Sequence, residues 1–142
     1  MPWKPFPETH ADVAPMLVVA DLVASVQFYV ELLGATAVDT WDTYAQLRLG
    51  AGRLRLVTPS AGTDDKPGIR LVPPPDRTNV TSEIVIHVDD CRAVHASLSR
   101  RGVTFPAPPS EPPWGGEVRC LLQDPDGHVI QMSQTDSPAE PH

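Results

Sequence analysis

Two titratable side chains, Glu83 and His87, lie on one face of a predicted β-strand, with Val85 between them. Side chains alternate between the two faces of a strand, so these three point the same way and are expected to line a cleft. A carboxylate near an imidazole can act as an acid–base pair or form part of a divalent metal site. Glutamate is disfavoured inside a strand without such a reason. The alternative is a strand end whose polar residues reach solvent.

A large aromatic side chain, Trp114, stands in a loop rich in proline and glycine, at 112–116. An indole ring can stack on a planar ligand, and a glycine-flanked loop could carry it as a lid. The alternative is a loop anchor packed on the core. Trp41 stands at the mouth of the first predicted hairpin and has the same two interpretations.

Several chemistries have no support in the sequence. It contains no glycine-rich nucleotide-binding motif, no phosphate loop, no Gly-x-Ser-x-Gly and no evident Cys–His–Asp arrangement. The net charge of −7 argues against nucleic acid or an anionic membrane as a partner, and suits either solubility or the attraction of a cationic ligand. Without a secretory signal or a membrane-spanning run, we expect a cytoplasmic protein in which Cys91 and Cys120 are reduced thiols.

The elements that must position these residues occur twice. Each copy is a short apolar strand, an aspartate, a helix and a closing glycine: strand 15–20, Asp21 and Gly34 in the first copy, and strand 83–88, Asp90 and Gly102 in the second. Aspartate is a favoured helix N-cap, and glycine is favoured just after a helix. The chain therefore contains two copies of one supersecondary unit.

Alternating residues predict the remaining strands at 43–49 and 53–57 in the first copy and at 117–122 and 129–132 in the second. The last two flank the turn Asp124-Pro125-Asp126-Gly127, after which His128 is expected to be exposed. We predict an α+β fold of paired βαβββ modules, each a strand, a helix and three strands, whose curved sheets enclose a cleft. The expected boundaries are a loose arm at 1–12, a first module at 13–58, a proline-rich connector at 59–80, a second module at 81–134 and a disordered tail at 135–142.

The order Asp21-Leu-x-x-Ser-x-x-Phe-Tyr-x-x-x-Leu-Gly34, followed in the second copy by Asp124-Pro-Asp-Gly127, resembles the vicinal oxygen chelate superfamily. That superfamily includes glyoxalase I, extradiol dioxygenases and bleomycin-resistance proteins. The resemblance extends over roughly residues 13 to 134. It implies paired βαβββ modules and a homodimer.

In the metal enzymes that the chain resembles, four His, Gln or Glu side chains from inner strands hold one divalent ion. The resemblance places the corresponding positions at Ala14, at Arg55 or Leu56, at Glu83 and at Gln131. Alanine and leucine cannot bind a metal and arginine would repel one, so only the second module keeps oxygen ligands. We therefore expect no metal cofactor. If a divalent ion does bind, Glu83, Gln131 and His87 would hold it.

Within the superfamily, the chain is most similar to bleomycin-resistance proteins, at Val13-Ala-Pro-Met-Leu17, at Leu54-Arg-Leu56 and at Pro113-Trp-Gly-Gly116. Those proteins form dimers whose grooves sequester a cationic drug without chemistry. The resemblance implies a binding protein for a small planar or cationic organic molecule, such as an antibiotic. The residues expected to contact this ligand are Trp114, Trp41, Glu83, His87, Gln131 and Arg55. The alternative is a metal-dependent lyase, isomerase or dioxygenase with an atypical site.

Overall fold

The computed structural model describes residues 10–136 of the chain. The first module contains β1 (Met16–Val18), α1 (Leu22–Gln27), the π-helix η1 (Phe28–Leu32), β2 (Thr36–Thr40), β3 (Tyr44–Leu49) and β4 (Gly52–Val57). The second contains β5 (Glu83–His87), α2 (Cys91–Arg100), β6 (Glu117–Gln123) and β7 (Val129–Thr135). Most of the predicted arm, 1–9, and of the predicted tail, 137–142, lies outside the described residues.

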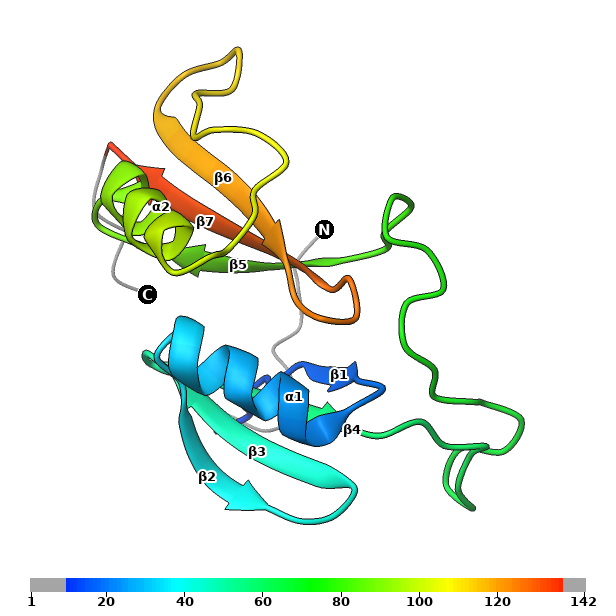
Figure 1. The fold of residues 1–142 in the computed structure, drawn as a ribbon. Coiled ribbons are helices and arrows are strands. Elements are labelled where there is room, and N and C mark those ends of the chain that lie inside the picture. Colours follow the sequence, from blue (N-terminus) through cyan, green and yellow to red (C-terminus); the bar gives the residue numbers. More distant parts are fainter. Residues whose placement is uncertain (1–9, 137–142) are drawn as a thin grey trace.

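Each module is a small curved sheet with a helix on one face (Figure 1). The first sheet has the strand order β1-β4-β3-β2, and the second has the order β5-β7-β6. The first strand of each module runs parallel to the last, while the other neighbours are antiparallel. The predicted α+β fold of paired modules is confirmed.

The two aspartates begin the helices as predicted. The side chain of Asp21 accepts a hydrogen bond from the backbone N–H of Ala24 at 3.1 Å, and that of Asp90 accepts one from Ala93 at 3.0 Å. These bonds satisfy N–H groups that the first helical turn leaves without partners. The first helix differs from the prediction in its second half, because it widens into the π-helix η1 before Gly34 ends it.

The second module has three strands in its sheet, so the prediction of a strand, a helix and three further strands is wrong in this detail. The segment before β6 contributes one isolated bridge, between Ser110 and Arg119. Pro106, Pro108 and Pro109 precede that bridge. Proline has no N–H to donate to a ladder, so this segment cannot pair along its length as an inner strand does.

The first strand is partly exposed although it is apolar, since Met16 keeps 44% of its surface accessible in the isolated chain.

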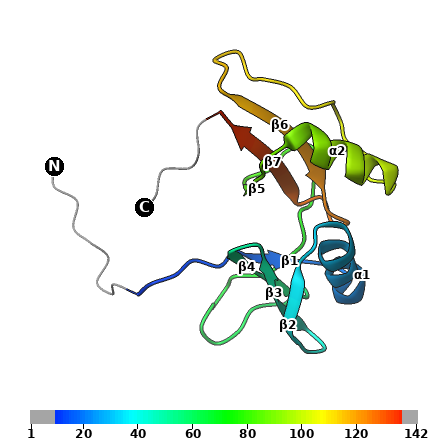
Figure 2. The same cartoon turned by 90° about the vertical axis from the view of Figure 1, so that its left-hand side faces the viewer.

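The main core lies on the helix side of the sheets. Its fully buried side chains include Leu47, Leu56, Leu122 and Ile130, from both modules. Both helices lie on the same side of the two sheets (Figure 2). The opposite face of each sheet therefore carries no helix.

Polar side chains join the modules. The hydroxyl of Tyr29 donates to the Asp124 carboxylate at 2.8 Å, and both residues are buried. The other oxygen of Asp124 accepts from the backbone N–H groups of Asp126 and His128, both at 2.9 Å. The ring Nε2 of His128 lies 2.7 Å from the carbonyl oxygen of Val18. His128 is thus half-buried at the module junction, and the expectation that it is exposed is wrong.

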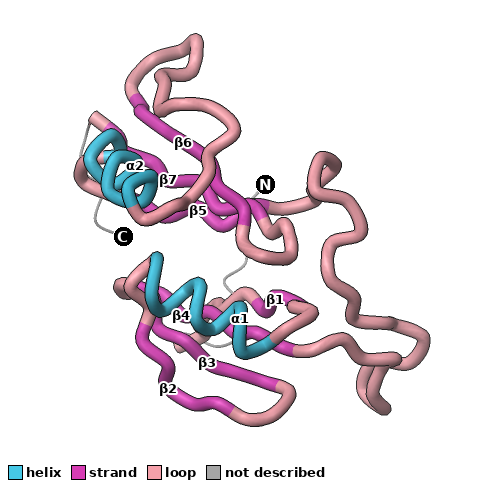
Figure 3. The backbone as a smooth tube through the Cα atoms, in the orientation of Figure 1, coloured by secondary structure: helices cyan, strands magenta, loops and turns pink. Residues whose placement is uncertain are grey.

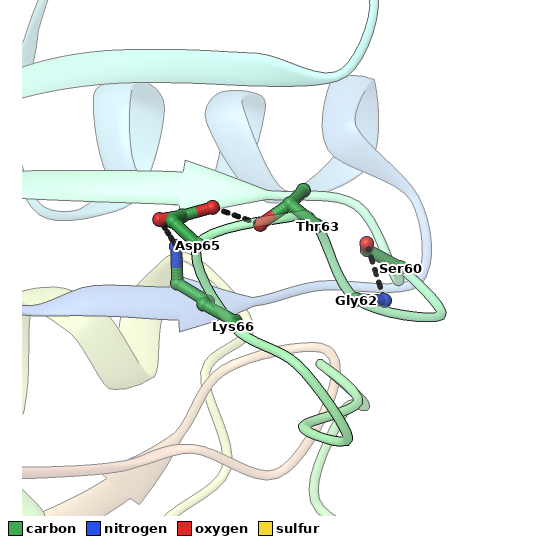
Figure 4. Close-up of polar contacts among 5 residues, drawn as sticks. All are labelled: Ser60, Gly62, Thr63, Asp65 and Lys66. Carbon is green, nitrogen blue, oxygen red and sulfur yellow. Dashed lines mark hydrogen bonds and ion pairs between the residues drawn. The ribbon is translucent and has the colours of Figure 1, made fainter.

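The segment between β4 and β5 is a long loop (Figure 3), and its Arg77 contacts the turn that follows β6. Local bonds shape its first part: Gly62 N–H donates to Ser60 Oγ at 3.1 Å, and Asp65 accepts from Thr63 and pairs with Lys66 (Figure 4). The hydrogen bond from Thr63 is the main cause that lowers the pKa of Asp65 to about 2. No helix between residues 10 and 136 has the length and apolar character needed to cross a membrane.

Candidate functional site

The helix-free face of the second sheet is here called the open face of module two. It carries the residues of β5 that were predicted to line a cleft. Glu83, Val85 and His87 are all exposed on it, as the alternation of β5 requires. Across the strands, Val85 pairs with Gln131 of β7, which pairs with Leu121 of β6. The prediction that Glu83 and His87 share a face is confirmed.

A cavity of about 370 Å³ brings two of the predicted residues together. Glu83 and Gln131 line it along with Arg119 and Leu121 of β6, and the loop at 106–110 forms its wall. An acid, an amide and a guanidinium therefore converge on a partly apolar hollow, which is the usual character of a small-molecule site.

His87 does not line this cavity, because it lies further along β5 and pairs with Ser133. Ser133 is buried and donates a hydrogen bond to Glu117. The structure therefore does not support the acid–base pair of Glu83 and His87 as one contiguous site.

Trp114, in the loop that precedes β6, is 73% exposed and does not itself line the cavity. Its ring lies over the guanidinium of Arg119, with 5.2 Å between the guanidinium carbon and the ring centroid. Arg119 also approaches Glu117, at 3.7 Å between Nη1 and Oε1. Because Arg119 lines the cavity, this chain of contacts places the indole beside it. An indole with most of its surface free can still stack on a ligand.

Trp41 lies apart from that cavity. Its ring packs on Tyr44 with 5.0 Å between centroids. It lines a separate cavity of about 440 Å³ together with Leu22, Val23 and Val26 of α1. The two tryptophans therefore do not flank one pocket in the isolated chain.

The structure resolves which residue of β4 faces the open side of module one. Leu56 is fully buried beneath α1, whereas Arg55 points to the open face and pairs with Met16 of β1. Met16 lies five residues before the cap Asp21, just as Val85, the partner of Gln131, lies five residues before the cap Asp90. Arg55 is thus the counterpart of Gln131.

The same comparison makes Ala14 the counterpart of Glu83, because each lies seven residues before its helix cap. The four matched positions are therefore Ala14, Arg55, Glu83 and Gln131. An alanine and a guanidinium provide no ligands, and a catalytic divalent site generally needs about three protein ligands. Between residues 10 and 136 no three His, Cys, Asp or Glu side chains gather closely enough to hold a metal ion. The residues at the four matched positions therefore do not fit a divalent metal.

Cys120 also borders the cavity, and its Sγ lies 3.5 Å from that of Cys91. Burial, followed by the hydrogen bond with Cys91, raises the pKa of Cys120 to about 12. A thiol that stays protonated is a poor nucleophile. The pair therefore belongs to the packing beneath α2 rather than to a reactive site.

A larger cavity of about 510 Å³ lies elsewhere, between η1 and the loops that follow α2 and β6. Two arginines face it, and both already bind backbone carbonyls. Arg77 donates to Pro125 and Asp124, and Arg101 donates to Glu31. This cavity contains none of the predicted site residues. The cavity on the open face is therefore the stronger candidate for a ligand site.

Sequence reasoning missed Arg119 and Leu121 as cavity residues. The signal was available, because β6 alternates and both residues fall on the face opposite the buried Cys120 and Leu122. The pairing with β7 that brings them next to Gln131 could not be read from the alternation alone.

A protein-family model of the Glyoxalase/Bleomycin resistance protein/Dioxygenase superfamily matches residues 10–132. None of the curated proteins matches the chain. A glyoxalase/bleomycin resistance protein/dioxygenase from Nocardioides is 21% identical, with a TM-score of 0.74 over 95% of this chain and 90% of that one.

Two further solved structures share the fold. A lactoylglutathione lyase from Agrobacterium tumefaciens is 15% identical, with a TM-score of 0.70 over 89% of this chain and 95% of that one. A bleomycin-binding protein complexed with bleomycin is 21% identical, with a TM-score of 0.64 over 89% of this chain and 99% of that one. With the two capped modules and the matched inner-strand positions, the family match establishes that the chain belongs to the glyoxalase/bleomycin resistance protein/dioxygenase superfamily.

Proposed function

We propose that this protein binds a small planar organic molecule, such as an antibiotic, on the open faces of its two sheets and holds it without chemical change. The observation that carries the proposal is the cavity shared by Glu83, Gln131 and Arg119, with the exposed ring of Trp114 packed over the guanidinium of Arg119. An aromatic anchor next to a few convergent polar groups is the arrangement expected for recognition of a planar ligand.

The donor set supports binding rather than metal-dependent chemistry. Arg55 occupies the position that matches Gln131, and Ala14 occupies the one that matches Glu83. Two oxygen donors in one module would leave a divalent ion with too few protein ligands. The bleomycin-binding protein of the same fold gives the proposal its ligand class.

Charge favours a ligand with at least one cationic group. The chain carries a net charge of −7, and Glu83 is exposed at the cavity. An exposed carboxylate in an acidic protein attracts cations and increases their rate of association at low ionic strength. An amine or guanidine on the ligand would therefore face Glu83.

We also propose that the protein is a homodimer. Met16 of β1 and Val85 of β5 are exposed apolar residues, and in the described part of the chain each of these strands pairs with one neighbour only. Unpaired strand edges with apolar side chains tend to be covered by a partner. Light scattering at several concentrations should give twice the chain mass; a monomer mass at every concentration would refute the dimer.

The binding proposal is tested by titrating bleomycin and a panel of other planar antibiotics while following tryptophan fluorescence. We expect saturable quenching by at least one compound, and its loss in Trp114→Ala. A panel without any response would reject the proposal. Elemental analysis of protein purified without chelator addresses the alternative: a stoichiometric divalent ion that disappears in Glu83→Ala would favour a metal-dependent enzyme.

A further inference from the structure

We infer that Arg55 forms a binding subsite for a planar oxyanion on the open face of module one, so that the ligand is a planar organic molecule carrying a carboxylate or a similar group. This inference rests on the proposed binding function and makes its ligand class more specific. A ligand that also carries an amine facing Glu83 would then have one negative and one positive group.

The first argument is that the Nε of Arg55 lacks a hydrogen-bond acceptor. Its Nε is buried, and among residues 10–136 it is the one buried side-chain nitrogen or oxygen without a hydrogen bond. Buried polar groups in folded proteins are almost always paired, so each exception calls for an explanation. A ligand that accepts from the guanidinium would supply the missing acceptor once the side chain turns its Nε toward the ligand.

The second argument is that the scaffold holds Arg55 in place. Its strand, β4, lies between β1 and β3, and Arg55 pairs with Met16 on one side and with Gln46 on the other. Its backbone N–H donates to the carbonyl of Pro15 at 2.9 Å. A side chain on a central strand is positioned more precisely than one on a loop, as recognition of a ligand requires.

The third argument concerns the surroundings of the guanidinium. Its central carbon lies 6.0 Å from the centroid of the Tyr44 ring, and that ring packs against Trp41. An aromatic wall therefore stands next to a positive charge. The two features match an aromatic carboxylate, whose ring can pack on tyrosine while its oxygens face the guanidinium fork.

The neighbouring arginines do not share these properties. Arg53 and Arg48 lie on the same open face, at opposite positions in the register of β4 and β3. Arg53 forms an ion pair with Asp12, and both Arg53 and Arg48 are exposed. Arg55 takes part in none of the three ion pairs found between residues 10 and 136. The subsite is therefore assigned to one residue rather than to a general basic patch.

The test compares naphthalene carboxylate with naphthalene carboxamide, two probes of nearly the same shape that differ in charge. Binding of each to the wild type, Arg55→Gln, Arg55→Lys and Arg48→Gln is measured by calorimetry. We expect the wild type to bind the carboxylate at least about tenfold more tightly than the carboxamide. Arg55→Gln should abolish this preference and leave carboxamide binding intact, Arg55→Lys should keep part of it, and the matched control Arg48→Gln should keep it.

Melting temperatures separate a binding role from a structural one. Arg55→Gln should unfold at the same temperature as the wild type or higher, because it removes a buried N–H group that has no partner in the fold. If Arg55→Gln does not fold, the inference is decided by the wild-type preference and by Arg55→Lys.

Three results would overturn the inference: equal affinity of the wild type for the two probes, an equal loss of preference in Arg48→Gln, or an unchanged preference in Arg55→Lys together with a large loss of stability in Arg55→Gln. If the wild type binds the carboxamide but does not prefer the carboxylate, only the Arg55 subsite is wrong. If it binds neither probe nor any antibiotic of the panel, the proposed function fails with it.

Discussion

Replacing Tyr29 by phenylalanine should destabilise the whole chain, because the Tyr29 hydroxyl is the buried donor that ties module one to the turn of module two. The Oη–Oδ2 distance to Asp124 is 2.8 Å, and each residue is only 1% exposed. Hydrogen bonds to charged groups contribute about 1.5–3 kcal/mol, and a carboxylate oxygen left buried without its donor adds to the loss. We therefore expect the free energy of unfolding to fall by about 2 kcal/mol.

Urea denaturation followed by circular dichroism measures this change, and it corresponds to a melting temperature roughly 6 °C lower for a chain of this size. The matched control is Tyr44→Phe, which removes the same atom from a half-buried ring that packs on Trp41. It should cost less than about 0.5 kcal/mol. If Tyr29→Phe is no more destabilising than Tyr44→Phe, the junction is not held by this bond and our account of how the modules are joined is wrong.

Three further predictions concern the cavity and the buried groups. Trp114→Ala should weaken binding of a planar ligand by at least roughly tenfold, near 1.4 kcal/mol, and leave the melting temperature unchanged; a lower melting temperature with intact affinity would make Trp114 a structural anchor. Glu83→Gln should weaken binding of a cationic ligand, and titrations at two salt concentrations should show a smaller effect at high salt, because screening already reduces the attraction there; an effect independent of salt would contradict a charge interaction. Burial raises the pKa of Cys120 from 9.0 to about 12 and, with the Asp124 carboxylate, raises the pKa of Tyr29 above its usual value. The folded chain thus retains protons that the unfolded chain releases, so the stability present below pH 9.0 should be lost progressively as pH rises toward about 12, as urea midpoints across this window would show; a Cys120→Ala variant should lose less, and an identical slope would contradict the assignment.

The elements with strong local signals could be predicted from the sequence. Asp21 and Asp90 cap the helices that they were expected to cap, and Gly34 and Gly102 have the positive φ values of 76° and 92° that favour glycine after a helix. These features depend on residues close in sequence. They identify two copies of one unit without any knowledge of the tertiary contacts.

The missing strand of module two had a local signal that the repeat outweighed. Module one forms four strands, and the same number was expected in module two. The prolines at 106, 108 and 109 prevent regular pairing, so that only the bridge between Ser110 and Arg119 remains. The missing N–H groups of these prolines thus prevent a fourth strand, even though the repeat predicts one.

The site could be predicted only in part, because it depends on register between distant strands. Glu83 and Gln131 were assigned through the resemblance, and the structure places both in one cavity. The choice between Arg55 and Leu56 required the pairing of β1 with β4. The contact of Trp114 with Arg119 joins a loop to a strand, and nothing in the local sequence specifies it.

The most direct test of the account is to map where a ligand binds. Backbone amide chemical shifts of the labelled protein would be followed by NMR while an antibiotic that quenches its tryptophan fluorescence is added. We predict that the shifts that change belong to the open faces, at Arg55, Arg119 and Gln131, and to the loop of Trp114. Changes confined to the cavity that Arg101 borders on the helix side would contradict the central claim that the open faces of the two sheets form the binding site.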